Sequence, residues 1–310
     1  MNELYLGIEI GGTKLQMVLG NLAGKIVERR RLTVNPKLGG QGIRRQIRAT
    51  LPTLLSGARL SGVGAGFGGP VDWRRGRICC SHQVAGWSEF DLGDWLQKRT
   101  HAPVRVDNDA NTAALGEARS GAGKNYSPVF YVTLGSGVGG GLVVDSRIYH
   151  GATPGEAEIG HVRLDRQGTI VESRCSGWAV DARIRQMKLQ EPQSALSRLA
   201  GDAVGGEARH LSAALQQGDP AARRVLRETA GDLAFGLSHV VHLFHPEIIV
   251  LGGGLSLMGE PLRVAVKAAL RPLIMEAFLP GPRLALSALG EDAVPVGALH
   301  LAQQANSSCS

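Results

Sequence analysis

Short apolar runs that stop at a glycine recur along the chain. Residues 4–10 (LYLGIEI) form the first run, and their composition predicts a buried strand that ends before Gly11. The same pattern predicts further strands over residues 15–21, 26–34, 62–66, 104–106, 129–134, 141–144 and 248–251. Because only short glycine-containing turns separate the first three strands, we expect these strands to form a β-meander.

Apolar residues at helical spacing occur between these strands. Helices are expected over about 40–56, from about 110, from 220 to before Pro246, and from about 257. Pro52 suggests an early break or kink in the first helix. Asp219 and Pro220 supply an N-cap and a first-turn proline to the third. The alternation of strands and helices predicts an α/β fold.

A unit of strand, glycine-rich turn and strand occurs twice, about 120 residues apart. This recurrence suggests a duplicated architecture, and 310 residues fit two domains of roughly 150 residues each. We expect a small N-terminal domain over 1–118, completed by a C-terminal helix at about 295–306, and a large domain over 119–294. No linker is rich in proline or serine, so we expect the domains to pack closely around a shared cleft.

Composition narrows the classes of function. Glycine accounts for 43 of 310 residues, about double its usual share of roughly 7%. It clusters at strand ends, which favours a binding site built from loops. The net charge is 34 − 27 = +7, but the basic residues stand in short scattered groups without interleaved aromatic residues. We therefore expect no nucleic-acid partner.

The sequence predicts neither secretion nor membrane insertion. Its N-terminus lacks a basic segment followed by a long apolar one. The uncharged stretch 125–144 contains five glycines, and we interpret it as two strands around a turn. The four cysteines show no CxxC spacing, which argues against a zinc ribbon or a disulfide framework. We expect a protein without a membrane partner, in a reducing cytoplasm.

Two glycine-rich turns are candidate phosphate sites. Gly135–Gly140 (GSGVGG) satisfies the pattern GxGxxG, but a strand follows where the dinucleotide fingerprint requires a helix, so we expect no Rossmann site. A hairpin turn can still bind phosphate through successive backbone N–H groups. The turns at 11–14 (GGTK) and 133–137 (TLGSG) occupy corresponding positions. This correspondence favours a bound nucleotide over two hairpins without a ligand.

Five segments, in order, resemble the motifs of the ROK (repressor–ORF–kinase) family of sugar kinases. These segments are Ile8–Lys14 (IEIGGTK), Gly66–Asp72 (GFGGPVD), Asn108–Asn111 (NDAN), Thr133–Gly139 (TLGSGVG) and Glu158–His161 (EIGH). The resemblance runs from residue 5 to about Gly297. It implies the actin-like, hexokinase-like (ribonuclease H-like) two-domain fold, with ATP and sugar meeting in the cleft.

The resemblance also implies roles for individual residues. It assigns ATP phosphates and adenosine to three turns: Gly11, Gly12, Thr13 and Lys14; Thr133, Gly135, Ser136 and Gly137; and Gly252, Gly253 and Gly254. It assigns sugar binding to Gly68, Asn108, Asp109, Glu158, His161 and Glu172. Phosphoryl transfer to a hydroxyl needs a base, and Asp109 matches the family's base, although a carboxylate at a helix start could be only an N-cap.

Three departures from the family pattern concern metals and the sugar site. Glu9 stands where the family usually has Asp, and it is expected to hold Mg²⁺ through water, which tolerates one extra methylene. Ala157, directly before the EIGH motif, replaces a glycine that is usual in the family. The family's CxCGxxGC zinc motif is missing, because residues 162–171 contain no cysteine. We therefore predict no structural zinc, which leaves His161 free to bind sugar.

These observations favour an ATP-dependent hexose kinase, most specifically a glucokinase that uses Mg²⁺, and we expect a homodimer. Fructose, mannose or an N-acylated amino sugar are alternative acceptors, and polyphosphate is an alternative donor. A sugar-sensing repressor is disfavoured because the first strand begins at Leu4, which leaves no room for a helix-turn-helix segment. A catalytically inactive sugar-binding protein is also disfavoured, since Lys14, Asp109 and both glycine turns are retained.

Overall fold

The structure is a computed structural model that describes residues 3–81, 84–155, 157–202 and 204–307. The chain divides into two compact units. Unit 1 consists of Met1–Asn125, Gly141–Ala157 and Leu289–Ser310, and unit 2 of Tyr126–Gly140 and Glu158–Ala288. This division follows contacts between residues rather than independent folding. The boundary expected after residue 118 therefore stays a prediction about separately folding domains.

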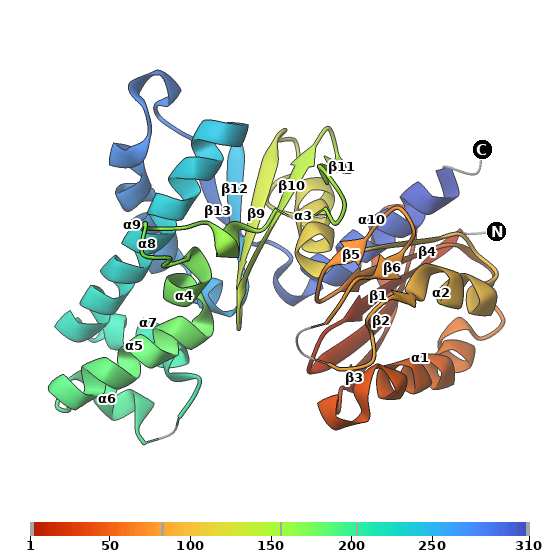
Figure 1. Ribbon diagram of the computed structural model, residues 1–310, viewed down its shortest axis with the longest axis horizontal. Coiled ribbons are helices and arrows are strands. Elements are labelled where there is room, and N and C mark those ends of the chain that lie inside the picture. Colours follow the sequence, from red (N-terminus) through yellow and green to blue (C-terminus); the bar gives the residue numbers. More distant parts are fainter. Residues whose placement is uncertain (1–2, 82–83, 156, 203, 308–310) are drawn as a thin grey trace. The chain divides into compact units, whose positions relative to one another are not determined.

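The first five-stranded sheet has the order β3-β2-β1-β4-β8 (Figure 1). Its strands are β1 (Leu4–Ile10), β2 (Lys14–Gly20), β3 (Ile26–Thr33), β4 (Leu60–Phe67) and β8 (Val104–Asn108). The strands β1, β2 and β3 form the expected meander, whereas β1, β4 and β8 run parallel. Apolar residues of this sheet and of α1 (Gly39–Leu55) and α2 (Leu92–Thr100) form one core cluster. The parallel strands consequently end at a common edge.

The second five-stranded sheet has the order β11-β10-β9-β12-β13. Its strands are β9 (Val129–Leu134), β10 (Val138–Val144), β11 (Arg147–Ile148), β12 (Ile248–Gly252) and β13 (Arg283–Leu286). A three-stranded sheet contains β5 (Val71–Asp72), β6 (Arg77–Ile78) and β7 (Phe90–Asp91). The remaining helices are α3 (Asp109–Ser120), α4 (Val171–Cys175), α5 (Gly177–Gln190), α6 (Ala195–Ala200), α7 (Leu211–Gln216), α8 (Pro220–Phe244), α9 (Glu260–Leu270) and α10 (Ala293–Ser307).

Most of the predicted elements are confirmed, with three differences in detail. The strand β10 begins at Val138, three residues earlier than expected, so the sequence GxGxxG leads into a strand as predicted. The helix α1 continues through Pro52 to Leu55, because buried leucines on both sides of the proline pack into the core. A 3₁₀ segment over Gly254–Met258 precedes α9, which delays that helix to Glu260. Among the described residues, no helix combines the length and the apolar character needed to cross a membrane.

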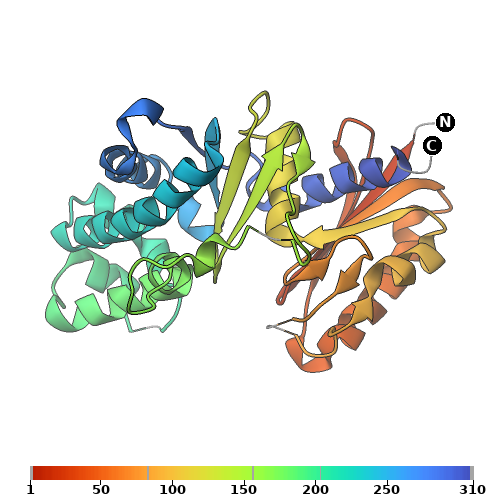
Figure 2. The same cartoon turned by 45° about the horizontal axis from the view of Figure 1, so that its top comes forward.

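The C-terminal helix α10 packs against glycines of β4 and α3, and Figures 1 and 2 show it in blue beside α3. A Cβ atom added at Gly64 would overlap the carbonyl oxygen of Ala298 on α10. Conversely, a Cβ atom at Gly297 of α10 would overlap the carbonyl oxygen of Thr112 on α3. Backbone therefore contacts backbone at these crossings, and no residue larger than glycine fits without displacement.

His300 of α10 is buried in this packing. Its Nε2 lies 2.7 Å from the Ser120 hydroxyl, and its Nδ1 lies 3.2 Å from Oε1 of Gln303. Burial lowers the pKa of His300 to about 4, and the positive charge of Arg119 contributes to the lowering. The folded protein therefore holds this imidazole neutral, whereas the unfolded chain would protonate it near pH 6.5.

The substitution Gly297→Ala is expected to destabilise the protein by about 1–3 kcal/mol, because the new methyl group forces α10 away from α3. A lower melting temperature by calorimetry would show this. Gly231→Ala is the matched control, because Gly231 lies inside α8 with open space around its Cβ position. Alanine should raise helix stability there. Equal melting temperatures for the two variants would contradict the packing argument.

Stability is expected to fall as the pH drops from 7 to 4.5, partly because the unfolded state binds a proton at His300 that the folded state excludes. This single group should cost about 2–3 kcal/mol over that interval. His300→Gln should therefore lose fewer degrees of melting temperature over the interval than the unsubstituted protein. The exposed His101 supplies the control, since His101→Gln should leave the pH dependence unchanged. Parallel pH curves for all three proteins would refute this role of His300.

Candidate active site

The parallel strands of unit 1 end together and place three of the six predicted sugar residues, Gly68, Asn108 and Asp109, at one edge. Ile10, Phe67 and Asn108 stand in register at the ends of β1, β4 and β8. The backbone N–H of Gly68 donates to the carbonyl oxygen of Ile10 at 2.9 Å. A Cβ atom at Gly68 would lie 3.4 Å from Oδ2 of Asp109. The structure thus brings the end of β1, Gly68 and the start of α3 together, as binding sites in α/β sheets require.

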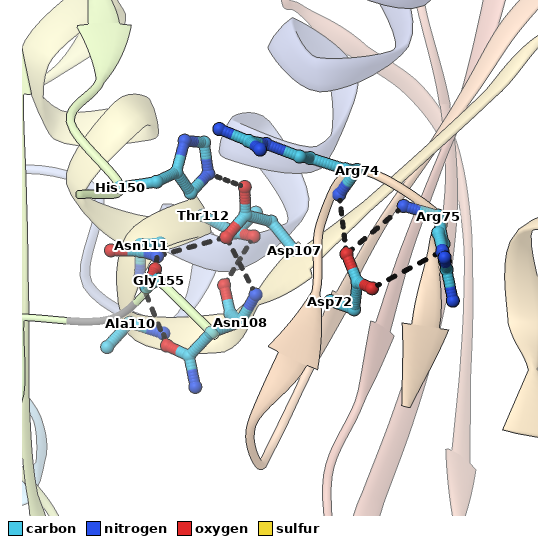
Figure 3. A network of polar contacts seen from close by, with 10 residues as sticks. All are labelled: Asp72, Arg74, Arg75, Asp107, Asn108, Ala110, Asn111, Thr112, His150 and Gly155. Carbon is cyan, nitrogen blue, oxygen red and sulfur yellow. Dashed lines mark hydrogen bonds and ion pairs between the residues drawn. The ribbon is translucent and has the colours of Figure 1, made fainter. Parts of the chain in front are cut away.

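Asn108 is the residue that caps α3 (Figure 3). Its Oδ1 accepts hydrogen bonds from the backbone N–H groups of Ala110 at 2.8 Å and Asn111 at 3.2 Å. Its Nδ2 donates to the carbonyl oxygen of Gly69 at 3.3 Å. Asp109 is the first residue of the helix, so the N-cap is its neighbour rather than Asp109 itself.

A buried carboxylate that the sequence did not reveal fixes this helix start. Asp107 accepts from the backbone N–H of Asn108 at 2.9 Å and from Nδ2 of Asn111 at 3.0 Å through Oδ1. Its Oδ2 lies 2.6 Å from Nε2 of His150, and Figure 3 shows Asp107 between His150 and Asn111. The His150 ring stacks on Trp73, with ring centroids 4.0 Å apart. The only sequence signal was three consecutive polar residues after a strand, and nothing in the sequence pointed to His150.

The first glycine turn joins β1 to β2. Gly11 N–H donates to the carbonyl oxygen of Lys14 at 2.9 Å and closes the hairpin. Lys14 Nζ lies 3.1 Å from Oε1 of Glu9, and Gln16 Nε2 donates to Oε2 of Glu9 at 2.6 Å. The predicted phosphate-binding lysine and the predicted metal-binding carboxylate are therefore ion-paired with each other. Gly12 and Thr13, the other predicted residues of this turn, lie between Gly11 and Lys14 in the sequence.

The second glycine turn joins β9 to β10 in unit 2. Gly135 N–H donates to the carbonyl oxygen of Gly137 at 3.0 Å. Glu172 Oε2 accepts from the backbone N–H of Val138 at 2.8 Å, so this predicted sugar ligand is bonded to the turn. In the part of the chain that the structure describes, the N–H groups of Ser136 and Gly137 donate to no acceptor. These two donors can bind a phosphate oxygen.

The remaining predicted sugar ligands lie on a neighbouring short segment. Glu158 and His161 are exposed; Glu158 precedes a 3₁₀ turn that ends at His161, and His161 N–H donates to the carbonyl oxygen of Glu158 at 3.1 Å. Gly160 lies against Val138, since a Cβ atom at Gly160 would overlap the Val138 carbonyl oxygen. Glu158, His161 and Glu172 therefore belong to one region of unit 2, next to the second glycine turn.

The third glycine turn completes a pocket of about 430 Å³ in unit 2. Gly252 stands beside Thr133 in the register of β12 with β9. Gly253 adopts a φ of +79°, and a Cβ atom there would collide with the backbone of Leu134. The pocket is lined by Leu134, Gly135, Ser136, Gly177, Trp178, Asp181, Gly206, Ala208, Arg209, Ser212, Gly254, Leu255, Leu257 and Met258. Two of the three predicted nucleotide turns thus share one pocket, whose size suits a nucleoside.

The two metal predictions differ in how the side chains fit them. Glu9 is a single, mostly buried carboxylate beside the first turn, which suits Mg²⁺ held through water and phosphate oxygens. The residues described contain no group of three or more histidine, cysteine or acidic side chains placed to hold a metal ion. Cys175, the cysteine nearest in sequence to His161, is buried, and burial raises the pKa of its thiol to about 12.

Comparison with known proteins places these features in a family. Residues 5–305 match the profile of the ROK family. The chain is 32% identical to a glucokinase of Halalkalibacterium halodurans, over 98% of this chain and 96% of that protein. A putative xylose repressor of Caldicellulosiruptor is 27% identical, over 83% of this chain and 67% of its own length.

A solved structure agrees over nearly the same length. The ROK family glucokinase of Streptomyces griseus, in complex with glucose and AMPPNP, superposes with a TM-score of 0.84 at 33% identity. The match covers 97% of this chain and 99% of that chain. This similarity confirms the predicted actin-like α/β fold. Together with the family match, it shows that the chain belongs to the ROK family, as a glucokinase-like sugar kinase homologue.

Proposed function

We propose that the protein is an ATP-dependent hexose kinase, and specifically a glucokinase that converts glucose to glucose 6-phosphate. The observation that carries the proposal is the position of Asp109 beside Gly68, at the edge where β1, β4 and β8 end. Because Asn108 caps the helix, Asp109 is not needed for that task. The glucokinase relatives and the AMPPNP complex support glucose as acceptor and ATP as donor.

The proposed reaction forms a bond between the sugar oxygen and the γ-phosphorus and breaks the bond from the γ-phosphorus to the β,γ-bridging oxygen. The sugar hydroxyl loses its proton to Asp109, and ADP leaves with the bridging oxygen. Lys14 and the backbone N–H groups of the two glycine turns would stabilise charge on the phosphates. Mg²⁺, held by Glu9 through water, would supply further neutralising charge to the phosphates when bound.

Sugar recognition is proposed to involve the residues that the family resemblance implies. The residues that would bind the hydroxyl groups are Gly68, Asn108, Asp109, Glu158, His161 and Glu172. The bond from Glu172 to Val138 gives that carboxylate a second task, which is to hold the second phosphate turn. The proposal includes a cytoplasmic homodimer without a nucleic-acid partner or structural zinc.

Substrate preference is tested by measuring ADP release with glucose, fructose, mannose and N-acetylmannosamine, each with Mg²⁺ and ATP. We expect the highest kcat/KM with glucose, loss of turnover on Mg²⁺ chelation, and slower turnover when polyphosphate replaces ATP. A higher kcat/KM for another hexose would reassign the acceptor. Calorimetric binding of a sugar without any turnover would contradict the enzyme and favour a sugar-binding regulator, as the similarity to a repressor allows.

The substitution Asp109→Asn tests the proposed base. An amide keeps the size and hydrogen bonding of the side chain but cannot accept the proton, so kcat should fall by about 10²–10⁴. Sugar affinity should change much less, and the melting temperature should stay close to that of the unsubstituted protein because Asn108 supplies the cap.

The control for this experiment is Asp94→Asn, which alters a carboxylate in the first turn of α2 that pairs with Lys98 at 2.6 Å. It should leave kcat unchanged. Turnover of Asp109→Asn close to that of the unsubstituted protein would show that another group accepts the proton.

A further inference from the structure

A second pocket in unit 1 contains none of the residues assigned to sugar or nucleotide. Its volume is about 620 Å³, within the range of small-molecule sites. Its walls come from β8, the last turn of α3, the turn between β10 and β11 with the residues that follow, and the C-terminal half of α10. Leu22 and Trp73 complete the lining. Trp73 lies in a turn in which Asp72 Oδ1 accepts from the backbone N–H groups of Arg74 and Arg75 (Figure 3).

The charged groups of this pocket are three arginines and two aspartates. Asp107 is already bonded to His150 and to the start of α3. Arg105 and Asp145 each have a further interaction. Among the residues that the structure describes, no acceptor is paired with Arg119 or Arg147. The pocket wall therefore carries two guanidinium groups without a counter-charge.

Of these two guanidinium groups, that of Arg119 has the greater need of a counter-charge. It is half-buried in the last turn of α3, and burial lowers the pKa of its guanidinium. The helix dipole favours a positive charge at the C-terminus of α3. It does not offset the free-energy cost of removing an unpaired guanidinium group from water. A bound anion would compensate the burial through charge-assisted hydrogen bonds.

The uncharged part of the wall includes the indole ring of Trp73. Trp73 stacks on His150 with an angle of 11° between the rings. Its Nε1–H is buried and has no acceptor among the described residues. The Arg74 guanidinium also lies 5.1 Å from the centroid of the indole ring. The carbon atoms with which Trp73 lines the pocket suit contact with the carbon skeleton of a small polar molecule.

We propose that this pocket binds a small phosphate monoester. Arg119 and Arg147 bind the phosphate, whose two negative charges match the two unpaired guanidinium groups, and Trp73 contacts the organic part. A monocarboxylate would leave one guanidinium without a partner. Planar guanidinium groups bind phosphate oxygens in pairs, which favours this ligand class further.

A ligand in this pocket would affect the proposed active site through Asp107 and His150, because both residues line the pocket. Asp107 bonds the backbone N–H of Asn108 and the side chain of Asn111, so a ligand that moves His150 acts on the first turn of α3. This consequence rests on the proposed function. Binding itself does not.

The test measures ligand binding to the intact protein by calorimetry, with glucose 6-phosphate and inorganic phosphate as probes. Saturating glucose and AMPPNP are present, so that the proposed substrate sites are filled. We expect glucose 6-phosphate to bind one site per chain, and inorganic phosphate to bind at least tenfold more weakly because it lacks the contact with Trp73. Absence of glucose 6-phosphate binding, or equal affinity for the two probes, would overturn the proposal.

The variants assign the binding to this pocket. Arg119→Met should weaken glucose 6-phosphate binding at least tenfold, and Arg119→Lys should weaken it less. Arg227→Met removes the same charge from an exposed position on α8 and should leave binding unchanged. If Arg119→Met does not fold, the exposed Arg147→Met replaces it, with the same expectation. Unchanged affinity in the arginine variants of the pocket would overturn the assignment, whether or not the protein proves to be a kinase.

Discussion

Direct backbone contact between α10 and its neighbours is the constraint on which unit 1 depends. Glycines at positions 64 and 297 let α10 approach β4 and α3 more closely than any side chain allows. The sheet, α10 and α3 therefore form one tightly packed block. Because α3 begins where β8 ends, this packing also fixes the place of Asp109 relative to the ends of β1 and β4. A residue that never touches a substrate can thus set the geometry of the candidate base.

The start of α3 is organised by a division of labour among three consecutive polar residues. Asp107 points to the interior and bonds His150 and Asn111, Asn108 caps the helix, and Asp109 lies next to Gly68. The three side chains point in different directions because the backbone changes from strand to helix geometry within these residues. The buried pair of Asp107 and His150 is tolerated because both oxygens of the carboxylate are hydrogen-bonded. Polar groups buried behind this helix start thereby hold the candidate base in place.

The sequence predicted those strands and helices that are marked by a signal in neighbouring residues. Apolar runs located the long strands, and Asp219 with Pro220 located the start of α8. The two-residue strands β5, β6, β7 and β11 gave no signal, because they are too short to show an alternating pattern. The bonds from His150 to Asp107 and from Glu172 to Val138 join residues 43 and 34 positions apart, so only the tertiary fold reveals them. The family motifs identified the candidate site residues, but not which atoms are already occupied by bonds within the protein.

The first and second glycine turns each have a carboxylate beside them, and this similarity affects how these turns would bind phosphate. Glu9 pairs with Lys14 at the first turn, and Glu172 accepts from Val138 at the second. A free carboxylate beside a phosphate would repel it, whereas one that is bonded to a lysine or a backbone N–H has part of its charge compensated. The Val138 N–H is consequently occupied, and the donors left to an anion are those of Ser136 and Gly137. A phosphate at the first turn would compete with Glu9 for Lys14, and a divalent cation shared by Glu9 and the phosphate would turn that competition into attraction. If the proposed nucleotide and Mg²⁺ bind at this turn, the ion pair of Glu9 and Lys14 would make the charge of the turn depend on both of them together.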